Sequence, residues 1–139
     1  MLRPLFALII GAFSFGAVLW DSSPSVTAPA FSARSSDSSG VRVVVTPKAL
    51  GPGVTVWEFE VIMDTHTKPL NENLAQVTAL VDEGGRRYNP VAWQGDPPGG
   101  HHRKGVLQFS APAEMPASVE LQITSVGGAG IRTFRWELK

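Results

Sequence analysis

Apolar and polar residues alternate along the chain from Val41 onward, in short runs separated by Gly and Pro. In the clearest run, Trp57 and Phe59 alternate with Glu58 and Glu60. A period of two is typical of β-strands that bury one face and expose the other, whereas the 3, 4, 7 spacing of an amphipathic helix does not occur in this region. The pattern therefore predicts an all-β domain.

Seven runs of this kind predict seven strands. They cover residues 41–46, 54–64, 74–82, 87–93, 105–110, 117–125 and 131–138. About seven short strands in roughly 100 residues are typical of an immunoglobulin-like antiparallel β-sandwich. Because the chain has no Cys, the central disulfide of many such domains is absent. We expect Trp57, Trp93 and Trp136 to fill the core instead.

The N-terminal residues follow a different pattern. Arg3 precedes 16 uncharged and mostly apolar residues, 5–20, a length between that of a signal-peptide core and that of a membrane span. Ala28 and Ala30 have the small side chains that signal peptidase accepts, but they lie well beyond the apolar segment. Residues 1–20 are therefore predicted to be a signal peptide or a membrane anchor helix, and both outcomes stay open.

Residues 21–40 hold eight Ser and two Pro, too little apolar surface to offset the entropy of ordering the chain. We expect them to form a linker, followed by the β-sandwich domain at residues 41–139. The whole arrangement predicts export. The domain would be periplasmic, or anchored to the inner membrane and outside the cytoplasm.

Charge and composition exclude several classes of function. The chain has 12 basic and 12 acidic residues, so no net field favours nucleic acid, and contact with a membrane is expected only through the N-terminal segment. Without Cys there is no thiolate zinc site and no catalytic thiol. No G-x-S-x-G motif and no Gly-rich phosphate loop occurs, so we expect a protein that is not an enzyme.

Antiparallel strands sort the loops between the two ends of the sandwich, because the chain reverses direction at every connection. The loops 65–73, 94–104 and 126–130 should share one end. The chain has three histidines, His66, His101 and His102. All of them fall in the first two of these loops, so we expect them at one end and Met115 at the other.

Three imidazoles at one end of a domain suggest a metal site. With Asp64 as a fourth ligand, or as a hydrogen-bond partner of His66, they could hold Cu(II) or Zn(II). No H-E-x-x-H or H-x-x-x-H spacing accompanies them. Geometry gives a test, because ligand nitrogens must approach within about 4 Å of one another.

Three other interpretations of the same end stay open. The histidines could hold the shape of the loops through hydrogen bonds to carbonyls, to Asp64 or to Asp96. The loops, with Trp93 at their edge, could instead form a surface that binds an envelope protein or a glycan.

The third alternative is an anion site. The amides of Gly99 and Gly100 together with Arg103 and Lys104 could cradle a negatively charged group.

Two sequence blocks carry a resemblance. Asp64-Thr65-His66, followed by Trp93-x-Gly95-x-Pro97-Pro98-Gly99-Gly100-His101-His102-Arg103, resembles a group of small exported bacterial β-sandwich proteins. The similarity covers most of residues 41–139. It implies export and the fold, and it implies no activity, because none is assigned to that group.

Overall fold

A computed structural model describes residues 16, 18 and 31–139 of the chain. The predicted signal or anchor segment and the first part of the predicted linker therefore lie outside the described residues. Within the part that is described, no helix is long and apolar enough to cross a membrane.

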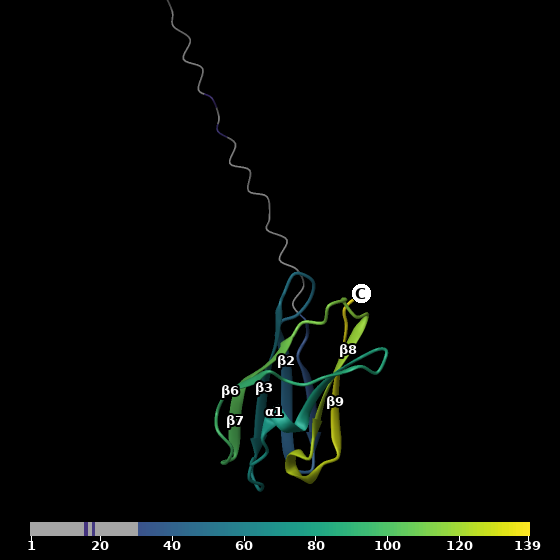
Figure 1. Cartoon of the computed structure of the whole chain (residues 1–139). Coiled ribbons are helices and arrows are strands. Elements are labelled where there is room, and N and C mark those ends of the chain that lie inside the picture. Colours follow the sequence, from purple (N-terminus) through teal and green to yellow (C-terminus); the bar gives the residue numbers. More distant parts are fainter. Residues whose placement is uncertain (1–15, 17, 19–30) are drawn as a thin grey trace, which may run out of the picture.

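Two antiparallel sheets face each other and confirm the predicted all-β sandwich (Figure 1). One sheet has the strand order β1-β2-β3-β7-β6, and the other has the order β5-β4-β8-β9. The strands are β1 Arg34–Ser38, β2 Val41–Ala49, β3 Val56–Thr65, β4 Thr78–Asp82, β5 Arg87–Tyr88, β6 Ala92–Gly95, β7 His102–Ser110, β8 Ser118–Thr124 and β9 Ile131–Glu137. A short helix, α1 Leu74–Val77, and a 3-10 turn, η1 Val126–Gly128, complete the described elements.

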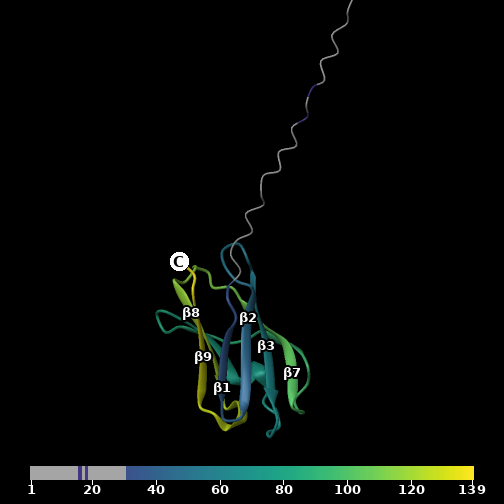
Figure 2. The same cartoon turned by 180° about the vertical axis from the view of Figure 1, so that it is seen from behind.

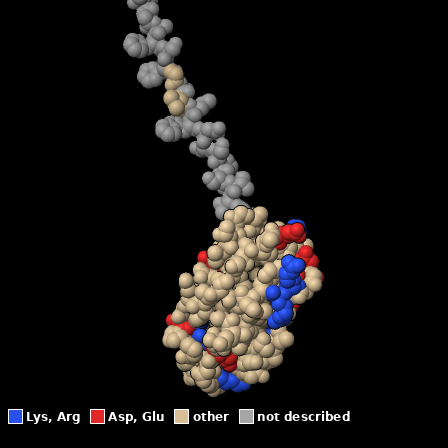
Figure 3. Space-filling view, viewed as in Figure 1, with Lys and Arg blue, Asp and Glu red and all other residues tan. Residues whose placement is uncertain are grey.

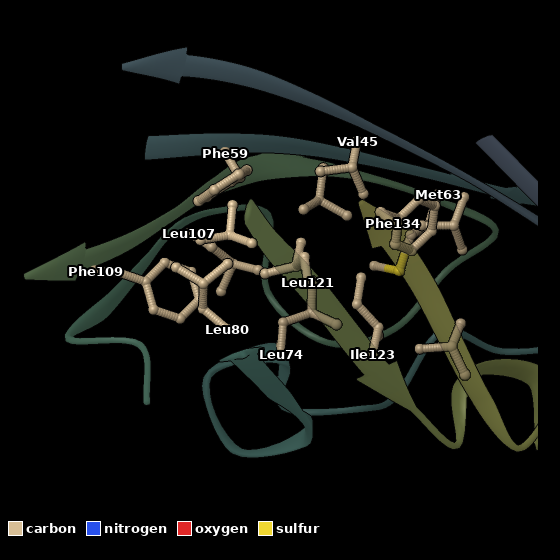
Figure 4. Close-up of a cluster of buried hydrophobic side chains, with 14 of the residues drawn as sticks. Val45, Phe59, Met63, Leu74, Leu80, Leu107, Phe109, Leu121, Ile123 and Phe134 are labelled. Carbon is tan, nitrogen blue, oxygen red and sulfur yellow. The ribbon is translucent and has the colours of Figure 1, made fainter. Parts of the chain in front are cut away.

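The core lies between the sheets and has the composition that the alternation predicts. Trp57 and Trp136 are 1% and 2% exposed, which confirms their predicted burial. Phe59 packs edge-to-face on Phe109 and lies at 5.5 Å from the ring of Trp136. Figure 4 shows how side chains from both sheets meet in this space.

The predicted strand 74–82 is wrong in its first half. Residues Leu74–Val77 form α1, and the Asn73 side chain caps it by accepting a hydrogen bond of 3.1 Å from the Ala75 N–H. The strand begins only at Thr78. Leu74 is buried in either conformation, so the apolar pattern did not distinguish one helical turn from a strand.

The predicted strand 87–93 is two strands in different sheets. Arg87–Tyr88 pairs with β4, whereas Ala92–Gly95 pairs with β7 on the opposite sheet. Pro90 lies between them and cannot donate a backbone hydrogen bond to a continuing ladder. The chain therefore crosses from one sheet to the other at this point.

The predicted linker also needs a correction, because it contains a strand. Arg34–Ser38 forms β1 and pairs antiparallel with β2 over five positions. None of its side chains is buried, so the hydrophobic pattern gave no signal for it. The ordered domain therefore includes residues that precede Val41.

Candidate functional site

The three loops that were predicted to share an end do so, and hydrogen bonds join them. The Leu70 N–H donates to the Gly100 carbonyl at 3.1 Å, and the Gly99 N–H donates to the Leu70 carbonyl at 2.8 Å. Lys68 Nζ donates to the Gly127 carbonyl at 2.7 Å. We call residues 66–73, 96–101 and 125–130 the loop end; in Figure 1 it is the lower end of the domain.

Met115 lies at the opposite end of the sandwich, as predicted. It lines a small cavity together with Gly51 and Pro52 of the β2–β3 loop, and Trp57 forms part of its wall.

Arg103 joins two of the loops from inside the domain. Its side chain is 1% exposed, and its guanidinium donates to the carbonyls of Leu70, Glu72 and Asp96 at 3.1, 2.8 and 3.2 Å. It also lies 5.6 Å from the ring centre of Trp93, a cation–π contact. Arg103 is therefore not at the surface, where the alternative of an anion site would need it.

The start of β7 explains this burial. The sequence predicted that the strand begins at Gly105, but it begins at His102. Alternation then turns Arg103 toward the interior, opposite the buried Met63, and exposes His102 and Lys104. Lys104 Nζ instead lies 3.7 Å from Glu60 Oε2, an ion pair on the outer face of the sheet.

A second buried arginine, Arg132, holds another part of the same end. It is 4% exposed and donates to the carbonyls of Ser38, Val41 and Val126 at 2.8, 3.1 and 3.1 Å, and to Ser36 Oγ at 3.1 Å. Arg132 is not among the residues predicted from the sequence. A signal was present, because Arg132 shares the apolar face of β9 with Phe134 and Trp136.

Both guanidinium groups remain charged in a desolvated place. Burial lowers the pKa of Arg103 and of Arg132, and the negative charge of Glu72 acts in the opposite direction on both. Each arginine remains protonated because its pKa in water is far above neutrality. Asp96 acts in the same direction as Glu72 on Arg103, and Asp37 acts on Arg132 more strongly than Glu72 does, so acidic side chains near the loop end offset both enclosed charges.

The histidines do not come together as a metal centre. His102 Nδ1 lies 2.5 Å from Asp64 Oδ1, and the two residues form a cross-strand pair between β3 and β7. His66 and His101 are exposed in two different loops. Among residues 16, 18 and 31–139, no group of three or more His, Asp or Glu side chains is arranged to hold a metal ion.

The remaining predicted residues shape the β6–β7 loop. Asp96 Oδ2 accepts from the Lys104 N–H at 2.9 Å, and the Asp96 carbonyl accepts from Trp93 Nε1 at 3.0 Å. Gly99 and Gly100 have φ values of 117° and 71°, which favour glycine. The Gly99 N–H is already bonded within the loop end, which weakens the case for an anion cradle.

Trp93 is half-buried and packs against the core rather than standing free. Its ring lies across Gly105, where an added Cβ would come within 2.5 Å of the indole. Gly105 is thus a further residue at the base of this loop that was not among the predicted site residues.

A cleft of 430 Å³ lies at the end opposite the loop end. Asp82, Glu83, Tyr88 and Met115 are among its lining residues. Asp82 Oδ1 accepts from the Gly84 and Arg86 N–H groups, so this carboxylate closes a turn. The carboxylates of Asp82 and Glu83 are therefore engaged within the fold.

Comparisons with protein-family models, with curated proteins and with solved structures find no match to this chain.

Proposed function

We propose that the chain is an exported, non-catalytic, immunoglobulin-like module that binds a protein partner through the loop end. The strand order supports the immunoglobulin-like part. Without the edge strands β1 and β5, the two sheets run β2-β3-β7-β6 and β4-β8-β9. This order corresponds to the A-B-E-D and C-F-G sheets of an immunoglobulin constant-type domain.

The observation that carries the proposal is the internal bonding of the loop end. Arg103 and Arg132 together bond carbonyls of the β1–β2, β3–β4, β6–β7 and β8–β9 regions. Loops that are ordered before binding lose less entropy when a partner arrives. His66, Pro97, Pro98 and His101 remain exposed on this ordered base and are available for contact.

The entry point of the chain supports the same surface. The Ser32 carbonyl accepts from Trp136 Nε1 at 2.8 Å. Trp136 lies near the last residue of β9, and β9 starts at the loop end. The chain therefore enters the domain at the opposite end, so a tether placed there would direct the loop end outward.

A protein partner fits the surface better than a glycan does. Sugar rings favour an exposed aromatic face, but Trp93 is half-buried and has the Arg103 guanidinium over its ring. Figure 3 shows that one face of the domain is largely uncharged, with charged side chains gathered along one edge and near the bottom. The bottom of this view is the loop end, which therefore mixes charged and uncharged side chains, as the polar rim of a protein interface does.

Site-specific photo-cross-linking in cells of the source organism tests the proposal. A benzophenone amino acid replaces His66 or Pro98 at the loop end, and Gly53 or Glu114 at the opposite end, in the full chain. We expect a light-dependent adduct of one defined mass from the first pair only. A double His66→Ala and His101→Ala change should weaken the adduct from position 98 by about tenfold. Adducts from the opposite end alone, or from neither end, would refute the proposal.

Metal titration separates this function from binding of Cu(II) or Zn(II) by His66, His101, His102 and Asp64. Calorimetry of the full chain with each metal is compared with His66→Ala, His101→Ala and Met115→Ala. A site of micromolar affinity that both histidine changes remove, and that the Met115 change leaves intact, would establish metal binding. Affinity for such a site should fall as pH drops through about 6.5, because an imidazole must be deprotonated to bind the metal and becomes protonated at low pH.

A further inference from the structure

Strand β1 is attached to the domain almost entirely by polar contacts. Four of its five side chains are exposed, and only Ser36 is half-buried. It lies at the edge of its sheet, next to β2, and its other side comes near β9 (Figure 2). A strand that buries no apolar side chain contributes little hydrophobic stabilisation. The residues that leave with it add the partly buried Phe31 and the Ser32 carbonyl bonded to Trp136 Nε1, and these contacts re-form in an exchanged pair.

The neighbouring strand β2, in contrast, buries several apolar side chains. β2 runs Val41–Ala49 and buries Val41, Val43 and Val45 completely, with Val44 half-buried on the other face. When β1 leaves, this valine-rich strand becomes an exposed edge with unpaired N–H and C=O groups. Such an edge pairs readily with a strand from another chain.

Arg132 restricts which strand can replace β1. Its buried guanidinium donates to Ser36 Oγ at 3.1 Å and to the Ser38 carbonyl at 2.8 Å, both on β1. A replacement strand that lacks these oxygens would leave part of a buried charge without acceptors, which is costly. The β1 strand of a second copy supplies the same atoms in the same order.

The turn between β1 and β2 stores strain that opening would release. Ser39 has φ 53° and Gly40 has φ 74°, so a two-residue turn places a serine in the left-handed region. Asn-Gly is the favoured pair in such a turn, and a non-glycine residue there is disfavoured. Short strained hinges of this kind promote exchange of a terminal element between copies.

From these observations we propose that β1 exchanges between two copies of this chain, so that the β1 strand of each copy pairs with β2 and Arg132 of the other. The Ser39-Gly40 turn is the hinge, and it straightens in the exchanged dimer. The proposal goes beyond the recognition function, because it pairs strands along the β2 edge and needs no other protein. Its hinge and Arg132 lie at the loop end.

Engineered cysteines test the exchange directly, because the chain has no Cys of its own. Ser35 and Val44 are directly paired between β1 and β2. Paired strand positions have Cα separations that suit a disulfide. The full chain with Ser35→Cys and Val44→Cys is oxidised after incubation at high concentration and analysed on a non-reducing gel. We expect a covalent dimer whose fraction rises with protein concentration during incubation.

Two hinge variants in the same background sharpen the test. Ser39→Asn gives the favoured Asn-Gly turn and should lower the dimer fraction, whereas Ser39→Val disfavours the turn and should raise it. The dimerisation constants of the two variants should differ by at least about tenfold, since each dimer contains two hinges. A dimer in which the cysteines link only within one chain would overturn the proposal. So would a chain that is monomeric at every concentration with either hinge residue.

Discussion

The two ends of the sandwich satisfy their backbone groups with side chains of opposite charge. At the loop end, the guanidinium groups of Arg103 and Arg132 donate to carbonyls inside the domain. At the opposite end, carboxylates accept from N–H groups at the surface. Asp82 bonds the Gly84 and Arg86 amides, and Glu83 Oε2 accepts from the Ser118 N–H at 3.4 Å.

The difference follows from where the bonded backbone groups lie. Long irregular segments cross the loop end and turn several carbonyls away from water, and a buried carbonyl needs a donor. Arginine has five N–H donors and can serve several carbonyls at once. At the opposite end, Asp82 closes the exposed β4–β5 turn locally, and Glu83 bonds the start of β8. Loss of an arginine side chain at the loop end should therefore disturb more of the structure than loss of the carboxylate that closes the β4–β5 turn.

The largest change in stability should come from Trp57, whose ring is buried between the sheets near the opposite end. Changing Trp57→Ala should lower the free energy of unfolding by about 3–5 kcal/mol, because a fully buried ring is lost between the sheets. Chemical denaturation measures the change. The neighbouring Val56 is 40% exposed, so Val56→Ala serves as the control and should cost below about 1 kcal/mol. Equal stability of both variants and the parent would show that the strand faces are misassigned.

Arg103→Met should lower the free energy of unfolding by less than Trp57→Ala does, but it should loosen both loops that the guanidinium joins. The substitution keeps the apolar stem as far as Nε but removes three hydrogen bonds: the Glu72 carbonyl loses its donor, and the Leu70 and Asp96 carbonyls keep only those from the Gly99 N–H and Trp93 Nε1. We therefore expect a loss of about 2–3 kcal/mol. Arg103→Lys should not restore stability, since one ammonium group cannot match the planar fork of the guanidinium. Lys104→Met, at the exposed neighbouring position, is the control. If Arg103→Met unfolds no earlier than this control, the guanidinium does not hold the loops.

The smallest effect concerns Glu83 at the opposite end. Hydrogen bonds from the backbone N–H groups of Ala117 and of Glu83 itself lower the pKa of this carboxyl from its ordinary value of 4.5. A lowered pKa in the folded state adds stability above pH 4.5, and this stability is lost as pH falls through the folded-state pKa. Glu83→Gln should therefore lose less stability than the parent on acidification below pH 4.5, as measured by thermal unfolding across pH. Identical pH profiles would argue against the bond to the start of β8.

The alternation of apolar residues was sufficient to predict the sandwich and the sorting of loops by end. It could not find β1, because that strand buries no side chain and is held by backbone pairing and by Arg132. It also misplaced Arg103, because a charged residue next to a Gly-rich segment has the composition of a loop. Only the pairing of Arg103 with Met63 across the sheet turns this residue inward. The three histidines were correctly placed at one end, but alternation along β7 directs His102 to the outer face with Asp64.

Amide hydrogen exchange of Leu70 and Gly99 tests most directly whether the loop end is an ordered platform. Their N–H groups bond across two loops, at 3.1 Å to the Gly100 carbonyl and at 2.8 Å to the Leu70 carbonyl. We predict slow exchange of both amides in the parent chain, and exchange at least about tenfold faster in Arg103→Met while the amides of β8 stay protected. Fast exchange of Leu70 and Gly99 in the parent chain would contradict the account, because the loops would then be mobile without a partner.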